Sequence, residues 1–492
     1  MAAASMSDTM PSGSEAFLAS TVLLGSIPHY IVLTQRALYT TNLTTRSDVL
    51  RGENPFSPFG ASSATDGTAN PRFRLYCIID DERRGGARSP VQYELEVLHM
   101  PQIDALAGGD GRSGVSGGAL EATKHWVTCL NTVARDGVLG DDEPLRRSVL
   151  ILVNPFGGKK KATQTMVDEV MPILLASGLA VDVIETQAQG HAVELARTVD
   201  LDAYDVIATA SGDGLLHEDG GADGGRRCFD AVSLAVIPTG SGNALANSIG
   251  VLTAIDAAYT LVKGKPRRID AMRLEQPEVG VSMHALVLFE WALVADVDYY
   301  SEQHRWMGDL RFDYEGLKRI LKLDKYTADL SFAYSARYVG GKLVLGADGE
   351  PESGELALAD EDFQIFALAN CAYQAKTTQI TPLAQVDDGT MDLAFVRSIS
   401  RAQLLKFFTK VATGKHVAHP AIEYYKVTHL ILDPQPKPGA KIGVDGEFIG
   451  YSRVIATVVP RMIPFLIVDD MLHAVVADSA QSVAEAAAAA SH

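Results

Sequence analysis

Three short apolar runs in this chain each lead directly into a loop that contains glycine. "SVLILV" is followed by "NPFGGKKKA", "DVIATA" by "SGDGLLHE", and "VSLAVI" by "PTGSGNALA". Helical patterns over residues 162–177 and 191–198, with the run "LAVDVIE" between them, separate the first two, and Pro172 predicts a kink in the first helix. Strands that alternate with helices form a parallel sheet covered on both faces. The sequence therefore predicts an α/β domain that binds its ligand beyond the C-terminal ends of its strands.

The sequence on either side of this region has the alternating pattern of β-strands. Residues 22–42 and 72–100 contain strand-like runs, and the Gly-, Ser- and Pro-rich stretches 52–71 and 106–118 predict loops or disorder. After Ala271, apolar residues recur at every second position, which predicts an antiparallel β domain. The final "SVAEAAAAASH" predicts a frayed helix.

Composition and charge exclude some classes of function. The 492 residues carry a formal net charge of −18, whereas a general nucleic-acid binder needs a basic surface to displace counterions. The four cysteines are too scattered for a disulfide framework or a zinc site, and they fit a reduced, cytoplasmic compartment. The first residues lack the basic and apolar parts of a signal peptide, and no uninterrupted apolar run reaches about 18 residues. We expect any membrane contact to be peripheral.

The three glycine loops together predict a nucleotide site. Each places backbone N–H groups and a helix N-terminus where they can face an anion. A single loop of this kind is more often a structural turn, but three at equivalent positions in one sheet favour a ligand site. Their spacing matches neither G-x-x-x-x-G-K-[ST] nor G-x-G-x-x-G, which excludes a P-loop enzyme and an ordinary dinucleotide binder.

Six motifs in order resemble one family of lipid kinases. "LVNPFGGKKKA", "SGDGLLHE" and "PTGSGNALA", followed by "ADVD", "RWMGDLRF" and "VDGE", are similar to the family that contains diacylglycerol kinase catalytic (DAGK) domains and, most closely, sphingosine kinases. The resemblance covers about residues 147–468. It implies a phosphofructokinase-like α/β nucleotide-binding domain at 147–271 and an antiparallel β-sandwich lipid-binding domain at 272–468. These would follow a small β-rich N-terminal module at 1–140 and precede a tail at 469–492.

The resemblance also implies roles for individual residues. Asp213 is the implied catalytic base, with Ser211, Gly212 and Gly214 shaping the approach of the substrate hydroxyl, and Asp298 binds the lipid head group. The implied ATP contacts are Asn154, Pro155, Phe156, Thr186, Gly190, Glu218, Gly240, Ser241, Gly242, Arg305, Arg311, Asp445, Gly446 and Glu447. Phosphoryl transfer requires an acceptor for the hydroxyl proton, Mg²⁺ and cations on the transferred group, and these residues can supply the first and the last. The sequence assigns no metal ligands.

Arg305 and Arg311 need a further feature to act together. They are six residues apart and would point to different faces of a continuous helix, so we expect a bend between them. Trp291 and Trp306 are expected in the core or in pocket walls. Asp298 has an alternative role as the N-cap of the helix that follows it.

Two segments depart from the family pattern. After "GDGLLHE" the family continues with an apolar helix, but residues 219–230 read "DGGADGGRRCFD", which predicts a shortened or missing helix and puts Glu218 in a different setting. Leu288 and Glu290 stand where small or polar residues are common, which predicts a different head-group pocket.

The leading hypothesis is ATP-dependent phosphorylation of the primary hydroxyl of a sphingoid long-chain base at a peripheral membrane surface. The alternatives are a diacylglycerol or ceramide kinase and a catalytically inactive lipid-binding regulator. Neutral lipids would leave the acid at Asp298 without a cationic partner to offset its desolvation. Retention of Asp213 argues against an inactive protein.

Overall fold

The computed structural model describes residues 18–24, 27–33, 38–42, 57–64, 72–81, 87–99, 147–157, 160–177, 179–188, 190–212, 232–240, 242–307, 310–376 and 378–490. The chain divides into two compact units. The first consists of Met1–Val149, Met166–Val181 and Ile255–Gly264, and the second of Leu150–Thr165, Asp182–Ala254 and Lys265–His492.

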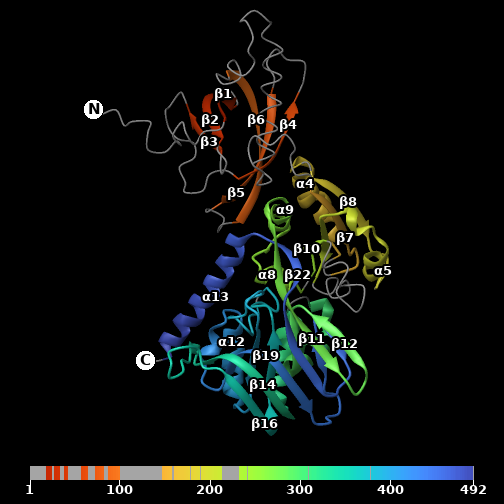
Figure 1. The fold of residues 1–492 in the computed structure, drawn as a ribbon, viewed down its shortest axis with the longest axis vertical. Helices are drawn as coiled ribbons and strands as arrows, with labels where there is room; N and C mark the ends of the chain where they lie inside the picture. The colour runs from red at the N-terminus through yellow and green to blue at the C-terminus, as the bar shows by residue number, and fades with distance from the viewer. Residues whose placement is uncertain are drawn as a thin grey trace, which may run out of the picture. The chain divides into compact units, whose positions relative to one another are not determined.

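The N-terminal part of the first unit is a six-stranded antiparallel sheet of order β3-β2-β1-β6-β5-β4 (Figure 1). Its strands are β1 Leu18–Leu24, β2 Ile27–Leu33, β3 Leu38–Asn42, β4 Ser57–Ala64, β5 Arg72–Asp81 and β6 Ala87–His99. The sheet confirms the predicted β-rich region. The prediction of a loop or disorder at 52–71 was wrong in part, because β4 lies within this stretch and pairs with β5. The stretch 106–118 lies outside the described residues.

The α/β region contains four strands in the order β10-β9-β7-β8. They are β7 Ser148–Val153, β8 Ala180–Glu185, β9 Val206–Ser211 and β10 Ser233–Pro238, and β9 and β10 run parallel. All of β9 is buried, as a strand covered on both faces should be. The predicted parallel sheet is therefore confirmed where β9 meets β10.

The helices of this region lie where the sequence predicts them. Helix α5 is His191–Thr198, and α3 Ala162–Thr165, the π-helical η2 Met166–Val170 and α4 Met171–Ser177 together fill 162–177. The π-helical turn ends at Val170, two residues before Pro172, which cannot donate a backbone hydrogen bond. The helix is therefore irregular near Pro172, where the sequence predicts a kink. The short η3 Leu201–Ala203, α8 Ala244–Ser248 and α9 Ala254–Lys263 complete the set.

The rest of the second unit is mainly antiparallel, which confirms the predicted β domain. The sheet continues in the order β21-β20-β13-β17-β18-β19-β22, with β11, β12, β14, β15 and β16 attached to it. The strands are β11 Lys265–Gln276, β12 Val281–Ala285, β13 Leu288–Ala292, β14 Tyr326–Val339, β15 Lys342–Leu343, β16 Gly354–Phe363, β17 Ile365–Ala369, β18 Met391–Val396, β19 Glu423–Pro434, β20 Ile442–Val444, β21 Glu447–Ile449 and β22 Val454–Ile467. An aromatic core between them includes Trp291, Phe366 and Phe395. The helices here are α10 Leu293–Ser301, η5 Glu302–Met307, α11 Leu310–Lys322, α12 Arg401–Val411 and η6 Lys415–Ala418.

Strand β22 connects the antiparallel strands to the α/β strands (Figure 1). It runs antiparallel to β11 and β19, and its end runs parallel to β10, where Phe465 pairs with Leu234. Helix α13 Asp469–Ala489 follows it. The predicted fraying of the final segment was wrong, because Val483 is buried and the Ser482 hydroxyl donates to the Thr413 carbonyl.

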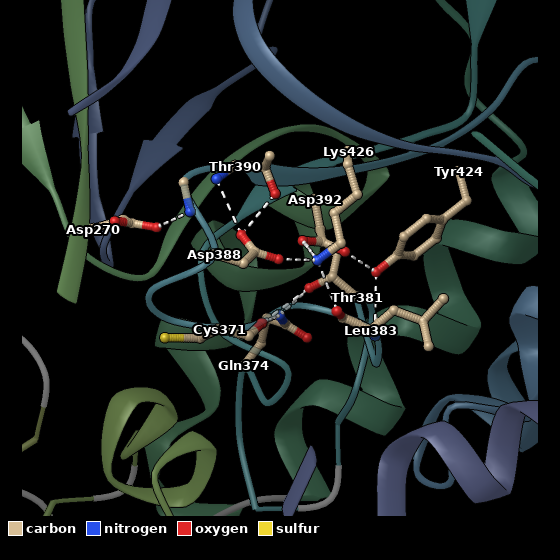
Figure 2. Close-up of polar contacts among 11 residues, drawn as sticks. Asp270, Cys371, Gln374, Thr381, Leu383, Asp388, Thr390, Asp392, Tyr424 and Lys426 are labelled. Carbon is tan, nitrogen blue, oxygen red and sulfur yellow. Dashed lines mark hydrogen bonds and ion pairs between the residues drawn. The ribbon is translucent and has the colours of Figure 1, made fainter. Parts of the chain in front are cut away.

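A buried polar network holds the loop between β17 and β18 against β19 (Figure 2). The Lys426 ammonium donates to the carboxylates of Asp388 and Asp392, both at 2.7 Å, and to the Leu383 carbonyl at 2.8 Å. The Tyr424 hydroxyl donates to the second oxygen of Asp392. Burial raises the pKa of Asp392 to about 6, although Lys426 opposes the shift. Burial lowers the pKa of Lys426, but the two carboxylates raise it by more.

Candidate functional site

The loops after β9 and β10 touch backbone to backbone. A Cβ atom on Gly212 would lie 2.6 Å from the Gly242 carbonyl oxygen, and one on Gly240 would lie 2.5 Å from the Cα and N atoms of Gly212. The amides of Thr239 and Gly240 both donate to the Ser211 carbonyl. The structure thus brings together Ser211, Gly212, Gly240 and Gly242, and glycine is required because any side chain would force the two loops apart.

The loop after β7 joins this pair through Asn154. Its backbone amide donates to the Ala210 carbonyl at 3.0 Å, and its side-chain amide lies 3.4 Å from the Ser211 hydroxyl. The Asn154 side-chain oxygen accepts from the amides of Phe156 and Gly157, which tightens the turn around Pro155. Phe156 is 64% exposed, so its ring is open to a ligand.

The segment after β8 lies next to the same loop. The Thr186 amide and hydroxyl both donate to the Val153 carbonyl, at 2.8 and 3.3 Å. Gly190 has a φ of 81°, a left-handed conformation that glycine adopts without strain, and it is the N-cap of α5. The predicted nucleotide residues after β7, β8 and β10 and the predicted substrate residues after β9 therefore lie at one edge of the sheet.

Part of the predicted site lies outside the described residues. These positions are Asp213, Gly214, Glu218 and Ser241, together with the whole departure at 219–230. Before this gap the described chain ends at Gly212, which belongs to the contact between the two glycine loops.

Two further polar residues at this edge were not singled out in the sequence. Within the described residues, the Thr239 hydroxyl and the Asn243 side-chain oxygen are buried and have no hydrogen-bond partner. Asn243 also donates to the Gly240 carbonyl, so its remaining oxygen is held in a fixed place. Both belong to the motif "PTGSGNALA", and their polar side chains beside the glycines were the signal that could have identified them.

Asp298 lies inside helix α10. The helix begins at Leu293 and its N-cap is Ala292, so the alternative role of Asp298 as a helix cap was wrong. Ala292 itself has a φ of 61°, which turns the chain sharply from β13 into α10. This turn directs Asp298 back toward β13, where its carboxylate forms a hydrogen bond with Glu290.

Glu290 is buried and interacts with Asp298. Burial raises the pKa of Glu290 well above its ordinary value, and the charge of Asp298, the hydrogen bond with Asp298 and the charge of Asp445 raise it further. This group of acids includes the second departure from the family pattern, because Glu290 contributes a carboxyl group that small residues could not provide.

The "VDGE" segment forms the hairpin turn between β20 and β21. Asp445 and Gly446 have φ values of 49° and 84° between the paired residues Val444 and Glu447, as in a two-residue type I′ turn. The Asp445 carboxylate accepts hydrogen bonds from three consecutive amides at 286–288, between 2.7 and 3.0 Å long. Asp445 therefore fixes the bend before β13, whereas Gly446 and Glu447 are exposed.

The two predicted arginines do not lie on one continuous helix. Arg305 is in η5, which has a non-helical residue at His304, and Arg311 is in the separate helix α11. The Arg311 guanidinium donates to the Glu302 carboxylate at 2.6 Å and lies over the Phe312 ring. The expected bend is therefore present.

A second set of charges fixes α10 against α11. Asp296 accepts from the Tyr326 hydroxyl and pairs with Arg319, which also bonds to the buried Glu315. Burial raises the pKa of Asp296, and its bonds to Tyr326 and Arg319 oppose the shift. Asp296, the first acid of "ADVD", thus fixes helix α10, which also carries Asp298, the second acid.

The two tryptophans have different environments. Trp291 is in the core as predicted, and its indole N–H donates to the Tyr451 hydroxyl. The prediction for Trp306 was wrong, because 83% of this residue is exposed. Among the described residues, no helix is long and apolar enough to cross a bilayer. In the same residues, no three His, Cys, Asp or Glu side chains are grouped to hold a metal.

Two family models match successive stretches of the sequence. The diacylglycerol kinase catalytic domain matches residues 148–274, and the YegS C-terminal NAD kinase beta sandwich-like domain matches residues 294–467. A solved structure, a putative diacylglycerol kinase from Bacillus anthracis str. Sterne, superposes with a TM-score of 0.50 at 17% identity. It covers 68% of this chain and 100% of its own, and it supports the fold.

Two sphingosine kinases are similar to this chain in sequence. Sphingosine kinase 1 of Arabidopsis thaliana is 30% identical over 338 residues, which cover 62% of this chain and 69% of the relative. Sphingosine kinase 1 of Homo sapiens is 30% identical over 347 residues, which cover 64% of this chain and 89% of the relative. The chain therefore belongs to the family of lipid kinases that contains the diacylglycerol kinase catalytic domains and the sphingosine kinases, and it is a transferase that phosphorylates an alcohol group of a lipid.

Proposed function

We propose that this lipid kinase transfers the γ-phosphoryl group of ATP to the primary hydroxyl of a sphingoid long-chain base. Asp213 accepts the hydroxyl proton, the hydroxyl oxygen bonds to the γ-phosphorus, and the bond from that phosphorus to the bridging oxygen breaks to release ADP. The product is a sphingoid base 1-phosphate. The names of the relatives support this substrate class.

The observation that carries the proposal is the group of acids around Glu290 on β13. Glu290, Asp298 and Asp445 gather there, and Asp445 already bonds to three backbone amides. A sphingoid base carries an ammonium group beside its hydroxyls, whereas ceramide and diacylglycerol carry none. A carboxylate next to an ammonium forms a charge-assisted hydrogen bond, so the pocket suits a cationic lipid.

ATP is proposed to bind at the edge formed by the three glycine loops, with the backbone at 240–242 facing its phosphates. We propose that ATP is also contacted by three residues of the antiparallel β domain, Arg305, Arg311 and Glu447. Mg²⁺ would neutralise the phosphate charge and would be held mainly by phosphate oxygens, as this ion usually is in kinases. We further propose that nucleotide and lipid functions divide near residue 271, and the two matched family segments support this division.

The test is a substrate panel with the purified protein. Labelled ATP is supplied with sphingosine, ceramide or diacylglycerol in detergent micelles, and we expect label in sphingosine. Preferential labelling of ceramide or diacylglycerol would replace the proposal with a neutral-lipid kinase. Binding of ATP without transfer to any of the three lipids would indicate an inactive regulator.

We also propose that α11 contacts the membrane surface. Leu310, Tyr314, Leu317 and Leu321 are all exposed, and their spacing places them on one face of the helix. An exposed apolar face of this kind is typical of helices that lie in the bilayer interface.

Sedimentation with phosphatidylcholine vesicles tests the membrane contact. We expect the double substitution of Leu317 and Leu321 to Glu to reduce the bound fraction, while activity on sphingosine in micelles is retained. The matched control replaces the exposed Leu345 with Glu. Equal sedimentation of the double variant and the wild type would contradict this role.

A further inference from the structure

Glu290 occupies a place that is built for its side chain. It lies on β13, opposite Ala367 of β17 on one side and Gly443 of β20 on the other. A Cβ atom on Gly443 would lie 2.5 Å from one Glu290 carboxyl oxygen, so only glycine leaves room for this carboxyl group. The small cross-strand neighbours allow an acid to be buried in the middle of the sheet.

The groups around Glu290 are acids. Asp298 faces it from α10 and forms a hydrogen bond with it, and Asp445 faces it from the β20–β21 turn. Two carboxyl groups can share a hydrogen bond only when one of them carries a proton. Since Glu290 is buried, an ionised carboxylate at this position would be costly.

We propose that Glu290 is a positioning residue that keeps its proton and donates it in a hydrogen bond to Asp298, so that the pair presents one oriented negative charge to the ammonium of the lipid substrate. This inference rests on the proposed sphingoid base substrate. The proton of Glu290 then holds one oxygen of the Asp298 carboxylate in place. The Asp445 carboxylate, which bonds to three amides, stays outside the pair.

The arrangement has a consequence for specificity. A second ionised carboxylate in the pocket would be an uncompensated buried charge once a single ammonium is bound. With Glu290 neutral, the charge of the pair is minus one and matches a lipid that carries one positive charge. Glu290 therefore affects how well the sphingoid base binds, whereas the transfer step depends on Asp213.

The experiment compares two substitutions of similar size. Glu290→Gln keeps an N–H donor toward Asp298 and imitates the protonated acid, whereas Glu290→Met keeps the chain length and removes the donor. We expect the KM for sphingosine of the Glu290→Gln variant to stay within about threefold of wild type. The KM of the Glu290→Met variant should rise about tenfold, the range for losing one hydrogen bond. The KM for ATP should stay the same in both. Glu290→Ala serves in place of Met if that variant does not fold.

Infrared spectra of the substrate-free protein test protonation without reference to the substrate. At pH 7.5 we expect a carbonyl band of a protonated carboxylic acid in the wild type that is absent from Glu290→Gln. Absence of this band from the wild type, or equal KM values for sphingosine in the Gln and Met variants, would overturn the inference. If the wild type phosphorylates diacylglycerol and not sphingosine, the proposed function fails, while the infrared result still decides the protonation of Glu290.

Discussion

Replacement of Lys426 by Met should destabilise the protein strongly. Its ammonium is buried and donates to Asp388, Asp392 and the Leu383 carbonyl (Figure 2). Met has a similar length and keeps the packing of the stem, but it leaves the fully buried Asp392 without a cation. Removing one partner of a buried ion pair costs about 3–5 kcal/mol.

The loss should depend on pH because Asp392 can take up a proton. Its folded pKa of about 6 lies above the unfolded value of about 3.9, so the folded state binds more protons and its stability falls as pH rises between these values. In the wild type this decrease, roughly 3 kcal/mol in all, ends near pH 6. Without Lys426 the folded pKa is higher still, and stability should continue to fall at about 1.4 kcal/mol per pH unit.

Thermal unfolding at pH 5, 6, 7 and 8 measures both effects. At pH 7 we expect the Tm of Lys426→Met to be about 10 °C below that of the wild type, and the difference should narrow at pH 5. Adding Asp392→Asn should restore part of the loss, because no buried charge then remains unpaired at that position. The matched control, Lys406→Met, changes an exposed lysine. A Tm within about 2 °C of wild type at pH 7, or a difference independent of pH, would refute the reasoning.

Three further predictions concern the proposed active site. Asp213→Asn should lower the rate of phosphoryl transfer by roughly 10²–10⁴ with ATP affinity retained, because the amide cannot accept the hydroxyl proton; activity within a few-fold of wild type argues against the base. Asp298→Asn should weaken sphingosine binding by about one to two powers of ten, since a charge-assisted bond is lost, and unchanged affinity in a titration excludes the head-group role. Gly240→Ala should weaken ATP binding at least about tenfold, because the added Cβ would lie 2.5 Å from the Gly212 backbone; unchanged nucleotide affinity by calorimetry means that the two loops can separate without loss.

The sequence alone predicted the features that depend on local chemistry. Apolar runs separated by helical spacing identified β7, β9 and β10, and glycines after each run identified the loops that meet at Gly212 and Gly240. Period-two alternation identified the antiparallel strands. These predictions succeeded because side-chain periodicity and the steric freedom of glycine act within a few residues of the chain.

Exposure could not be predicted in the same way. The chemistry of a tryptophan favours burial, and Trp291 is buried, but Trp306 in η5 is exposed. The small apolar residues at the end of the chain predict a helix. In the structure, Val483 of α13 packs near Gly341, and this contact between distant segments holds the helix in place.

The remaining features depend on which distant segments become neighbours. The sequence of the end of β22 predicts one more strand of the antiparallel domain. In the structure, Phe465 in this strand pairs instead with Leu234 of the α/β region. Glu290 is an ordinary acid in the sequence, and its pairing with Asp298 depends on the turn at Ala292 and on Gly443 in the neighbouring strand. Only the tertiary structure brings these groups together, and the burial of Glu290 there is what raises its pKa.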